Sequence, residues 1–364
     1  MIYLFSKLIF LLRRPRLIIV SGNFREISSE SIYQCLKYRS LPAIKIKNLN
    51  FKRTLIKVIL SSFFSNKFII IESASHNLDN VDWMVRKSIL PIFVFNNFKE
   101  KKEEKDIEKI NKIIESLPSF GCFILNLDNE RLEPFPKDIK SKVFTFGFKE
   151  NSDFRITDTV LIDSPSFGTN FKLNFKRMVI PIWLDGLFGK EEIYASLSSM
   201  IVGVFLNFNL IKISESLKSC HGLKGKMRLI KGIKKTWVLN NSNPSYVDSM
   251  IESLDVMEKI PFEGRKILVL GNLVGEENLI EVYEKVGEKV SSLADILITF
   301  GSGAKIIAEK AKEKGMDVEK IFKFDTIEQG KLLVQEKIKK DDLILVSGSK
   351  EMKMSGIVDE IRNY

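Results

Sequence analysis

The chain has 364 residues, 45% of them hydrophobic, so it has room for two or three domains with apolar cores. Its 57 Lys and Arg against 46 Asp and Glu give a formal net charge of +11, which favours contact with anions. Its three cysteines and two histidines lack CxxC or HxxxH spacing, which argues against a zinc site or a disulfide framework and favours a reducing, cytoplasmic interior. The lysines alternate with glutamates in helical stretches and form no basic stripe with aromatics, which disfavours nucleic acid as a partner.

An apolar segment, "MIYLFSKLIFLL", opens the chain and is followed by "RRPR". A membrane-spanning helix needs about twenty residues, so this segment is too short. A signal peptide places its positive charge before the apolar run, and here the order is reversed. Two interpretations of residues 1–14 stay open: a short helix packed on the domain, or a helix at the cytoplasmic face of an anionic membrane, with residues 1–16 in peripheral contact.

Strands and helices alternate from residue 15 onward. Nearly continuous apolar runs predict buried parallel strands at 16–22, 67–73, 90–97, 121–128 and 142–148, and helical patterns occupy 26–39 and 105–117. Shorter alternating segments between 152 and 184 predict a small antiparallel sheet, and a helical section follows. We therefore predict an α/β domain with a mostly parallel sheet over residues 15–222.

A second unit begins near the glycine- and lysine-rich stretch "HGLKGKMRLIKG", which predicts a domain boundary. Beyond it, strands are predicted at 235–241, 265–272, 294–301, 320–325 and 342–348, with helices between them. This rhythm predicts a doubly wound, Rossmann-like domain over residues 223–364. In such sheets, ligands bind beyond the carboxyl ends of the strands.

Several segments occur in an order that resembles a known family. In the C-terminal half they are "GKMRLIKG", "WVLNNSNPSYVDSM", "VLGNLVGEE" and "DDLILVSGSKEMKM", and upstream they include "IIIESASHNLDNVDWM" and "ILNLDNE". Together they resemble the Mur ligase family, most closely the type that adds D-alanyl-D-alanine to the cell-wall precursor. The resemblance runs from about residue 15 to the end. It implies the family's central and C-terminal domains without its separate uridine-nucleotide domain.

The resemblance also implies a phosphate-binding loop. Family members use ATP and Mg²⁺ to join an amino acid or dipeptide to a carboxylate, and their loop reads roughly "TGSNGKTTTKE"; here residues 21–31 read "SGNFREISSES". Arg25 replaces the second glycine, Glu26 the phosphate lysine and Ile27 the magnesium-binding threonine. Glu26 has the wrong charge for a triphosphate, and the Arg25 side chain prevents a close backbone approach. We interpret the loop as degenerate; its nucleotide positions are Gly22, Asn23, Arg25, Glu26, Ile27 and Ser28.

Other positions that the family uses for nucleotide or metal have also changed. The implied nucleotide positions are Asn97, Glu191, Lys226, Asn240 and Asn241, and the implied metal ligand is Glu72. Glu191 replaces a histidine, and Asn240 and Asn241 replace two aspartates, one of which holds the nucleotide ribose in the family. Removing a single electrostatic element already costs orders of magnitude in rate. The combined losses therefore indicate lost activity.

Three hypotheses follow. The first is a pseudoenzyme without a cofactor, which acts as a binding or scaffolding partner of an active Mur ligase or a cell-wall precursor. The alternative is an active ATP-dependent amino acid or dipeptide ligase of cell-wall precursor synthesis with a divergent phosphate loop, which would use ATP and Mg²⁺. The third, a basic nucleic-acid-binding protein, is disfavoured by the scattered lysines.

Overall fold

The computed structural model describes residues 2–47, 50–62, 67–97, 104–129, 136, 138–163, 166–218, 220–244, 249–273 and 279–363. The chain divides into two compact units. Unit 1 comprises Met1–Thr159, Asn170–Leu184 and Lys190–Cys220, and unit 2 comprises Val160–Thr169, Asp185–Gly189 and His221–Tyr364.

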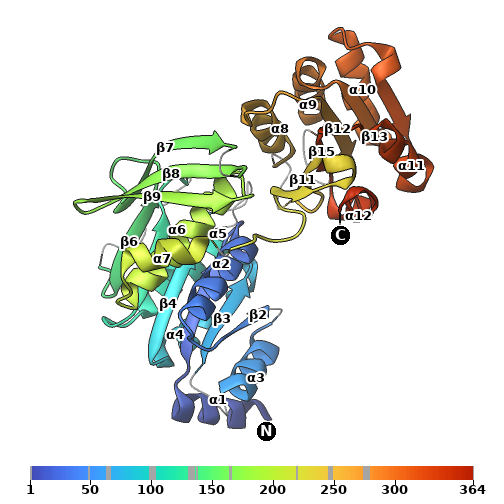
Figure 1. Ribbon diagram of the computed structural model, residues 1–364. Coiled ribbons are helices and arrows are strands. Elements are labelled where there is room, and N and C mark those ends of the chain that lie inside the picture. Colours follow the sequence, from blue (N-terminus) through green and yellow to red (C-terminus); the bar gives the residue numbers. More distant parts are fainter. Residues whose placement is uncertain are drawn as a thin grey trace. The chain divides into compact units, whose positions relative to one another are not determined.

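Unit 1 is built on a nine-stranded sheet (Figure 1). Its strands are β1 (Arg16–Ser21), β2 (Ala43–Lys47), β3 (Phe68–Ser73), β4 (Leu90–Phe95), β5 (Cys122–Asn126), β6 (Lys142–Gly147), β7 (Phe154–Ile162), β8 (Gly168–Phe175) and β9 (Met178–Asp185). The spatial order is β2-β3-β1-β4-β5-β6-β7-β8-β9, and the first seven strands pair in parallel.

Helices cover this sheet because its strands are apolar on both faces. The helices are α1 (Ile2–Arg13), α2 (Arg25–Tyr38), α3 (Phe51–Ser62), α4 (Val81–Lys87), α5 (Glu104–Ser116), α6 (Lys190–Phe205) and α7 (Leu210–Leu217), with a short 3₁₀ helix, η1 (Ser75–Asn77). In β1, Leu17 and Ile19 join the core cluster formed with α1, α3, α4 and α5, whereas Ile18 and Val20 are buried on the opposite face. On the other side, α2 packs against β1, β3 and α6.

The predicted fold class is confirmed, with two differences. The predicted small sheet is not separate: β7 pairs in parallel with β6 through Phe146–Phe154 and Gly147–Arg155, and β8 and β9 follow β7, so these three strands extend the large sheet. The edge strand β2 was missed because its sequence, "AIKIK", is short and half polar.

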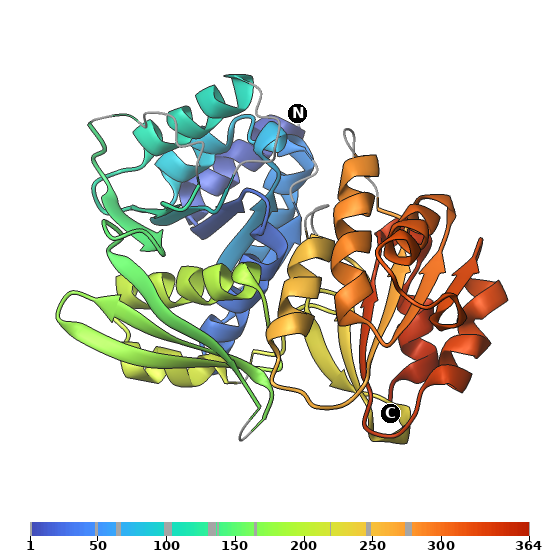
Figure 2. The ribbon, with the colours of Figure 1, turned by 90° about the horizontal axis from the view of Figure 1, so that it is seen from above.

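Unit 2 holds a six-stranded sheet with helices on both faces (Figures 1 and 2). Its strands are β10 (Arg228–Lys231), β11 (Trp237–Asn241), β12 (Lys266–Gly271), β13 (Ile296–Phe300), β14 (Ile321–Phe324) and β15 (Leu343–Ser347), in the order β10-β11-β15-β12-β13-β14. Its helices are α8 (Ser249–Lys259), α9 (Leu279–Leu293), α10 (Ser302–Glu313), α11 (Ile327–Lys337) and α12 (Ser355–Ile361), with 3₁₀ helices η2 (Ile233–Lys235), η3 (Val318–Lys320) and η4 (Lys350–Met352).

Alternate residues of the central strands of unit 2 supply two separate cores. Leu268 and Leu270 of β12 pack with residues of α8, α9 and α10, whereas Ile267 and Val269 pack with residues of α11 and α12. Of the six strands that the structure describes in unit 2, β10 alone runs antiparallel, against β11. The Rossmann-like, doubly wound prediction is therefore confirmed. Within the described residues, no helix is both long and apolar enough to cross a membrane.

All three cysteines are buried and free. Burial raises the pKa of the Cys35 thiol to about 11 and the pKa values of Cys122 and Cys220 to about 12. Only the thiolate is nucleophilic, so these residues act as small apolar side chains rather than as reactive groups.

We predict that the native protein does not react with a thiol reagent at pH 8. At that pH the thiolate fraction of Cys35, whose pKa is about 11, is roughly one in a thousand. The measurement is the absorbance change with an aromatic disulfide reagent, with the urea-unfolded protein as the control in which all three thiols react. Rapid reaction of one thiol in the native state would contradict the buried arrangement.

Candidate functional site

The turn between β1 and α2 is fixed by its contact with the chain after β4. Gly22 has a φ of +102°, and a Cβ placed on it would lie 2.5 Å from the carbonyl oxygen of Asn97. The amide nitrogen of Asn23 donates to that same oxygen at 3.2 Å. Only glycine fits this position, because a side chain would meet main-chain atoms in a backbone conformation that L-residues avoid. The structure thus brings together the predicted residues Gly22, Asn23 and Asn97.

The side chains at the start of α2 contact their own unit. Nη1 of Arg25 donates to the carbonyl oxygen of Gly22 at 3.1 Å, so the guanidinium lies back on the turn. The Glu26 carboxylate lies 3.7 Å from Nζ of Lys47, an exposed ion pair. Phe24 is buried, and its ring stacks on Tyr194 of α6 with a centroid distance of 5.9 Å.

Tyr194 is itself held in place by a carboxylate. Its hydroxyl donates to Oδ2 of Asp128 at 2.9 Å, and Asp128 also accepts from the amide nitrogens of Phe148 and Lys149 at 2.7 and 3.1 Å. Phe24 therefore stacks on an anchored ring. Glu191, a predicted nucleotide position, lies buried in the first turn of the same helix.

The next residues of α2 are tied to neighbouring strands. Ile27 is buried and faces the core, and Oγ of Ser28 accepts from Nδ2 of Asn96 at 2.9 Å. Glu72, at the carboxyl end of β3, accepts a hydrogen bond of 2.6 Å from Oγ of Ser29. Among the described residues, no group of three or more His, Cys, Asp or Glu side chains is arranged to hold a metal. The metal role of Glu72 stays a prediction.

In unit 2, the predicted residues Asn240 and Asn241 end β11 with different roles. Asn241 is fully buried, and its Nδ2 donates to Oγ of Ser347 at 3.0 Å, which joins the ends of β11 and β15. Asn240 accepts from the amide and hydroxyl of Ser242 at 3.2 and 2.8 Å. Lys226 is also buried. The resembling stretch 245–248 lies outside the described residues.

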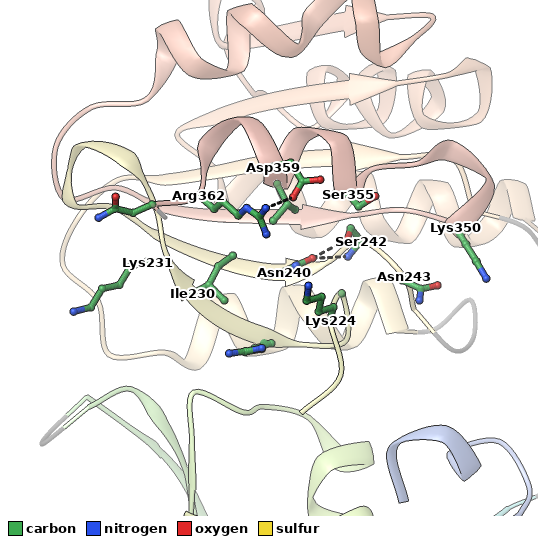
Figure 3. Close-up of a pocket in the computed structure, with 14 residues that line it drawn as sticks. Lys224, Ile230, Lys231, Asn240, Ser242, Asn243, Lys350, Ser355, Asp359 and Arg362 are labelled. Carbon is green, nitrogen blue, oxygen red and sulfur yellow. Dashed lines mark hydrogen bonds and ion pairs between the residues drawn. The ribbon is translucent and has the colours of Figure 1, made fainter. Parts of the chain in front are cut away.

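A cavity of about 700 Å³ opens beside Asn240, between the segment 224–231 and α12 (Figure 3). Its charged lining residues are Lys224, Arg228, Lys231, Lys350, Arg362 and Asp359. Among the described lining residues the one carboxylate is that of Asp359, which pairs with Nη2 of Arg362 at 3.3 Å. Four further cations thus surround polar side chains in a concave site, an arrangement that attracts an anionic group.

Sequence reasoning found one wall of this cavity and missed the rest. Asn240 was predicted, and so was Lys226 in the stretch that contains Lys224 and Arg228, but neither Lys224 nor Arg228 was predicted as a site residue. Lys350 and Arg362 lie more than a hundred residues further along the chain. Only the pairing of β10 with β11 and the position of α12 bring them together.

No protein-family model matches the chain. Among curated proteins, the chain is 26% identical over 265 residues to a UDP-N-acetylmuramate–L-alanine ligase of Dictyoglomus turgidum. This match covers 67% of this chain and 54% of the relative. It is 25% identical over 224 residues to the UDP-N-acetylmuramoyl-tripeptide–D-alanyl-D-alanine ligase of Bacillus subtilis, covering 60% and 46%. The chain thus spans about half the length of these two relatives.

Solved structures share the fold over nearly the whole chain. The D-alanyl-D-alanyl ligase from Acinetobacter baumannii aligns with a TM-score of 0.77 at 16% identity, covering 98% of this chain and 79% of that one. The MurF ligase from Thermotoga maritima, solved with ADP, has a TM-score of 0.73 at 15% identity, covering 98% and 81%. The chain is thus similar in sequence and in fold to amide ligases that build peptidoglycan precursors. More particularly, it is a relative of the Mur ligase family, including the type that adds D-alanyl-D-alanine.

The close contact between Gly22 and Asn97 predicts that a side chain at position 22 destabilises the fold. We expect Gly22→Ala to lower the free energy of unfolding by about 2 kcal/mol or more, because the new Cβ adds strain and a main-chain clash. The control is Gly356→Ala, where nothing lies within 4 Å and the expected change is within about 1 kcal/mol. Equal urea midpoints for both variants would refute the argument.

The cavity predicts binding of a small anion. We expect inorganic pyrophosphate to bind the protein, and Arg228→Ala or Lys350→Ala to weaken that binding about tenfold each, since each removes a charge-assisted contact. Lys320→Ala, an exposed change elsewhere in unit 2, serves as the control. Titration calorimetry at two salt concentrations measures the effect, and identical affinities in all four proteins would exclude this cavity as the site.

Proposed function

We propose that this chain is a catalytically inactive relative of the peptidoglycan-precursor ligases that acts as a binding or scaffolding protein. The observation that carries the proposal is the state of the β1–α2 turn. The turn follows a strand and precedes a helix, as a phosphate loop does. Its side chains, however, bind within unit 1: Phe24 stacks on Tyr194, Arg25 donates to Gly22, and Glu26 pairs with Lys47.

The residues at this turn do not fit ATP with Mg²⁺. A phosphate site at a helix N-terminus needs free backbone N–H groups and positive charge. Here Glu26 places a carboxylate in the first turn of α2, and the Arg25 guanidinium donates to Gly22. Ile27, at the position of the metal-binding hydroxyl, packs into the core.

The binding role rests on the cavity of unit 2. Its excess of cations suits a phosphate- or carboxylate-bearing molecule, and cell-wall precursors of the kind that the relatives' names describe carry such groups. We therefore favour an anionic cell-wall precursor over an active Mur ligase as the molecule bound. A cytoplasmic location stays a prediction.

An active ligase with a divergent loop is the second candidate. The observation that favours it is the position of Arg25, a cation that lies on the turn itself, 3.1 Å from the Gly22 oxygen. In that case Arg25 would turn toward the nucleotide and take the part of the missing lysine. The same experiment separates the two candidates.

The test is calorimetric titration of Mg-ATP and Mg-ADP into the wild type and into a combined Arg25→Gly, Glu26→Lys, Ile27→Thr variant. We expect the wild type to bind Mg-ATP no more tightly than it binds pyrophosphate, and the variant to bind Mg-ATP more tightly because it regains the glycine, the lysine and the hydroxyl. The circular dichroism spectrum of each protein serves as the folding control. Micromolar affinity of the wild type for Mg-ATP, or ATP turnover with a D-amino acid or dipeptide acceptor, would overturn the proposal.

A further inference from the structure

The positive charge of the chain is concentrated at one end of the sequence. Residues 1–71 contain thirteen Lys and Arg against two acidic residues, Glu26 and Glu30, which equals the whole net charge of +11. Residues 72–364 are therefore neutral overall. The sequence from Ser31 to Ile71 contains no acidic residue at all.

Helices α1 and α3 lie side by side at one end of unit 1 (Figure 1). Both helices leave apolar side chains exposed. On α1, Phe5, Leu8 and Leu12 follow one another at helical spacing, and Leu12 is 76% exposed. On α3, Leu60 is 68% exposed. Single exposed apolar residues are common on protein surfaces. A row of three along one helix, with a further exposed leucine on the neighbouring helix, is uncommon.

The inner side of α1 fixes the helix to the unit. Phe10 is fully buried and lies 5.1 Å from the ring of Trp83, measured between ring centroids. Lys7 lies over the same ring at 5.2 Å. Because α1 is anchored through Phe10, the row Phe5, Leu8 and Leu12 faces away from the core of unit 1.

Cations border the exposed apolar residues. Arg13 and Arg14 are exposed at the end of α1, and Lys52, Arg53 and Lys57 are exposed on α3. Neither helix contains an acidic residue. We define the α1–α3 face as Phe5, Leu8, Leu12, Leu60 and these five cations.

We propose that the α1–α3 face is a docking surface for an anionic lipid bilayer. Apolar side chains gain by entering the boundary between headgroups and acyl chains, and neighbouring Lys and Arg are attracted to anionic headgroups. A nucleic acid would use the cations and leave the leucines in water, which is why the combination favours lipid. The inference depends on neither the β1–α2 turn nor the cavity of unit 2, so it stands apart from the proposed function.

The experiment is co-sedimentation of the full chain with two kinds of vesicle, phosphatidylcholine alone and phosphatidylcholine mixed with phosphatidylglycerol. We expect binding to the anionic vesicles that weakens with salt, and little binding to the neutral ones. Two variants test the two components: Leu8→Ser with Leu12→Ser, and Arg53→Glu with Lys57→Glu. Both variants change exposed groups only. The charge variant is expected to lose about tenfold or more in vesicle affinity, since one basic residue contributes about fivefold. The leucine variant is expected to lose about tenfold or more because it no longer inserts two apolar side chains below the headgroups.

Matched controls make the same chemical changes in the neutral part of the chain. Ile280→Ser with Val318→Ser alters two exposed apolar residues, and Lys312→Glu with Lys320→Glu makes the same change in net charge. Both controls should bind vesicles more tightly than the matched face variants, and thermal unfolding confirms that all five proteins are folded. The proposal fails if the wild type ignores anionic vesicles, or if face and control variants bind equally. Retention on RNA or DNA without vesicle binding would also overturn it.

Discussion

The close approach of Gly22 to the main chain of Asn97 is the constraint on which the candidate site of unit 1 depends. β1 and β4 are neighbours in the sheet, so the residues that follow β4 pass directly beside the end of β1. The turn must then be narrow, and α2 begins immediately after it. Strand pairing and one glycine therefore set the backbone of the turn, and with it the positions of residues 25–29 at the start of α2.

The side chains of the β1–α2 turn differ from those of a phosphate loop in what they contact. In a phosphate loop, small residues leave the N–H groups of the helix terminus open to an anion. Here Phe24 is stacked on Tyr194, Tyr194 is held by Asp128, and Arg25 lies back on Gly22. These contacts stabilise the turn through its own residues. Under the proposed function, these contacts preserve the fold that the chain shares with Mur ligases while the groups that handle nucleotide are replaced.

The two surfaces with excess positive charge differ in shape and in what accompanies the charge. The cavity of unit 2 is concave, and its cations stand beside Asn240 and Ser242, which suits a small polar anion. The α1–α3 face of unit 1 combines its cations with exposed leucines, which suits an extended anionic surface with an apolar interior. Charge alone would not distinguish the two sites; the neighbouring side chains do.

The sequence by itself determined the two α/β units, nearly all of the strands and the outline of the β1–α2 turn. Continuous apolar runs and a single glycine are local signals, and each indicates the secondary structure of its own segment only. Tertiary structure alone decided that Phe24 stacks on Tyr194 and that Ser29 donates a hydrogen bond to Glu72. It also decided that Lys224 lines the same cavity as Lys350 and Arg362. These partners lie between 43 and 170 residues apart. Only strand order and helix packing decide whether they meet, and no local pattern contains that information.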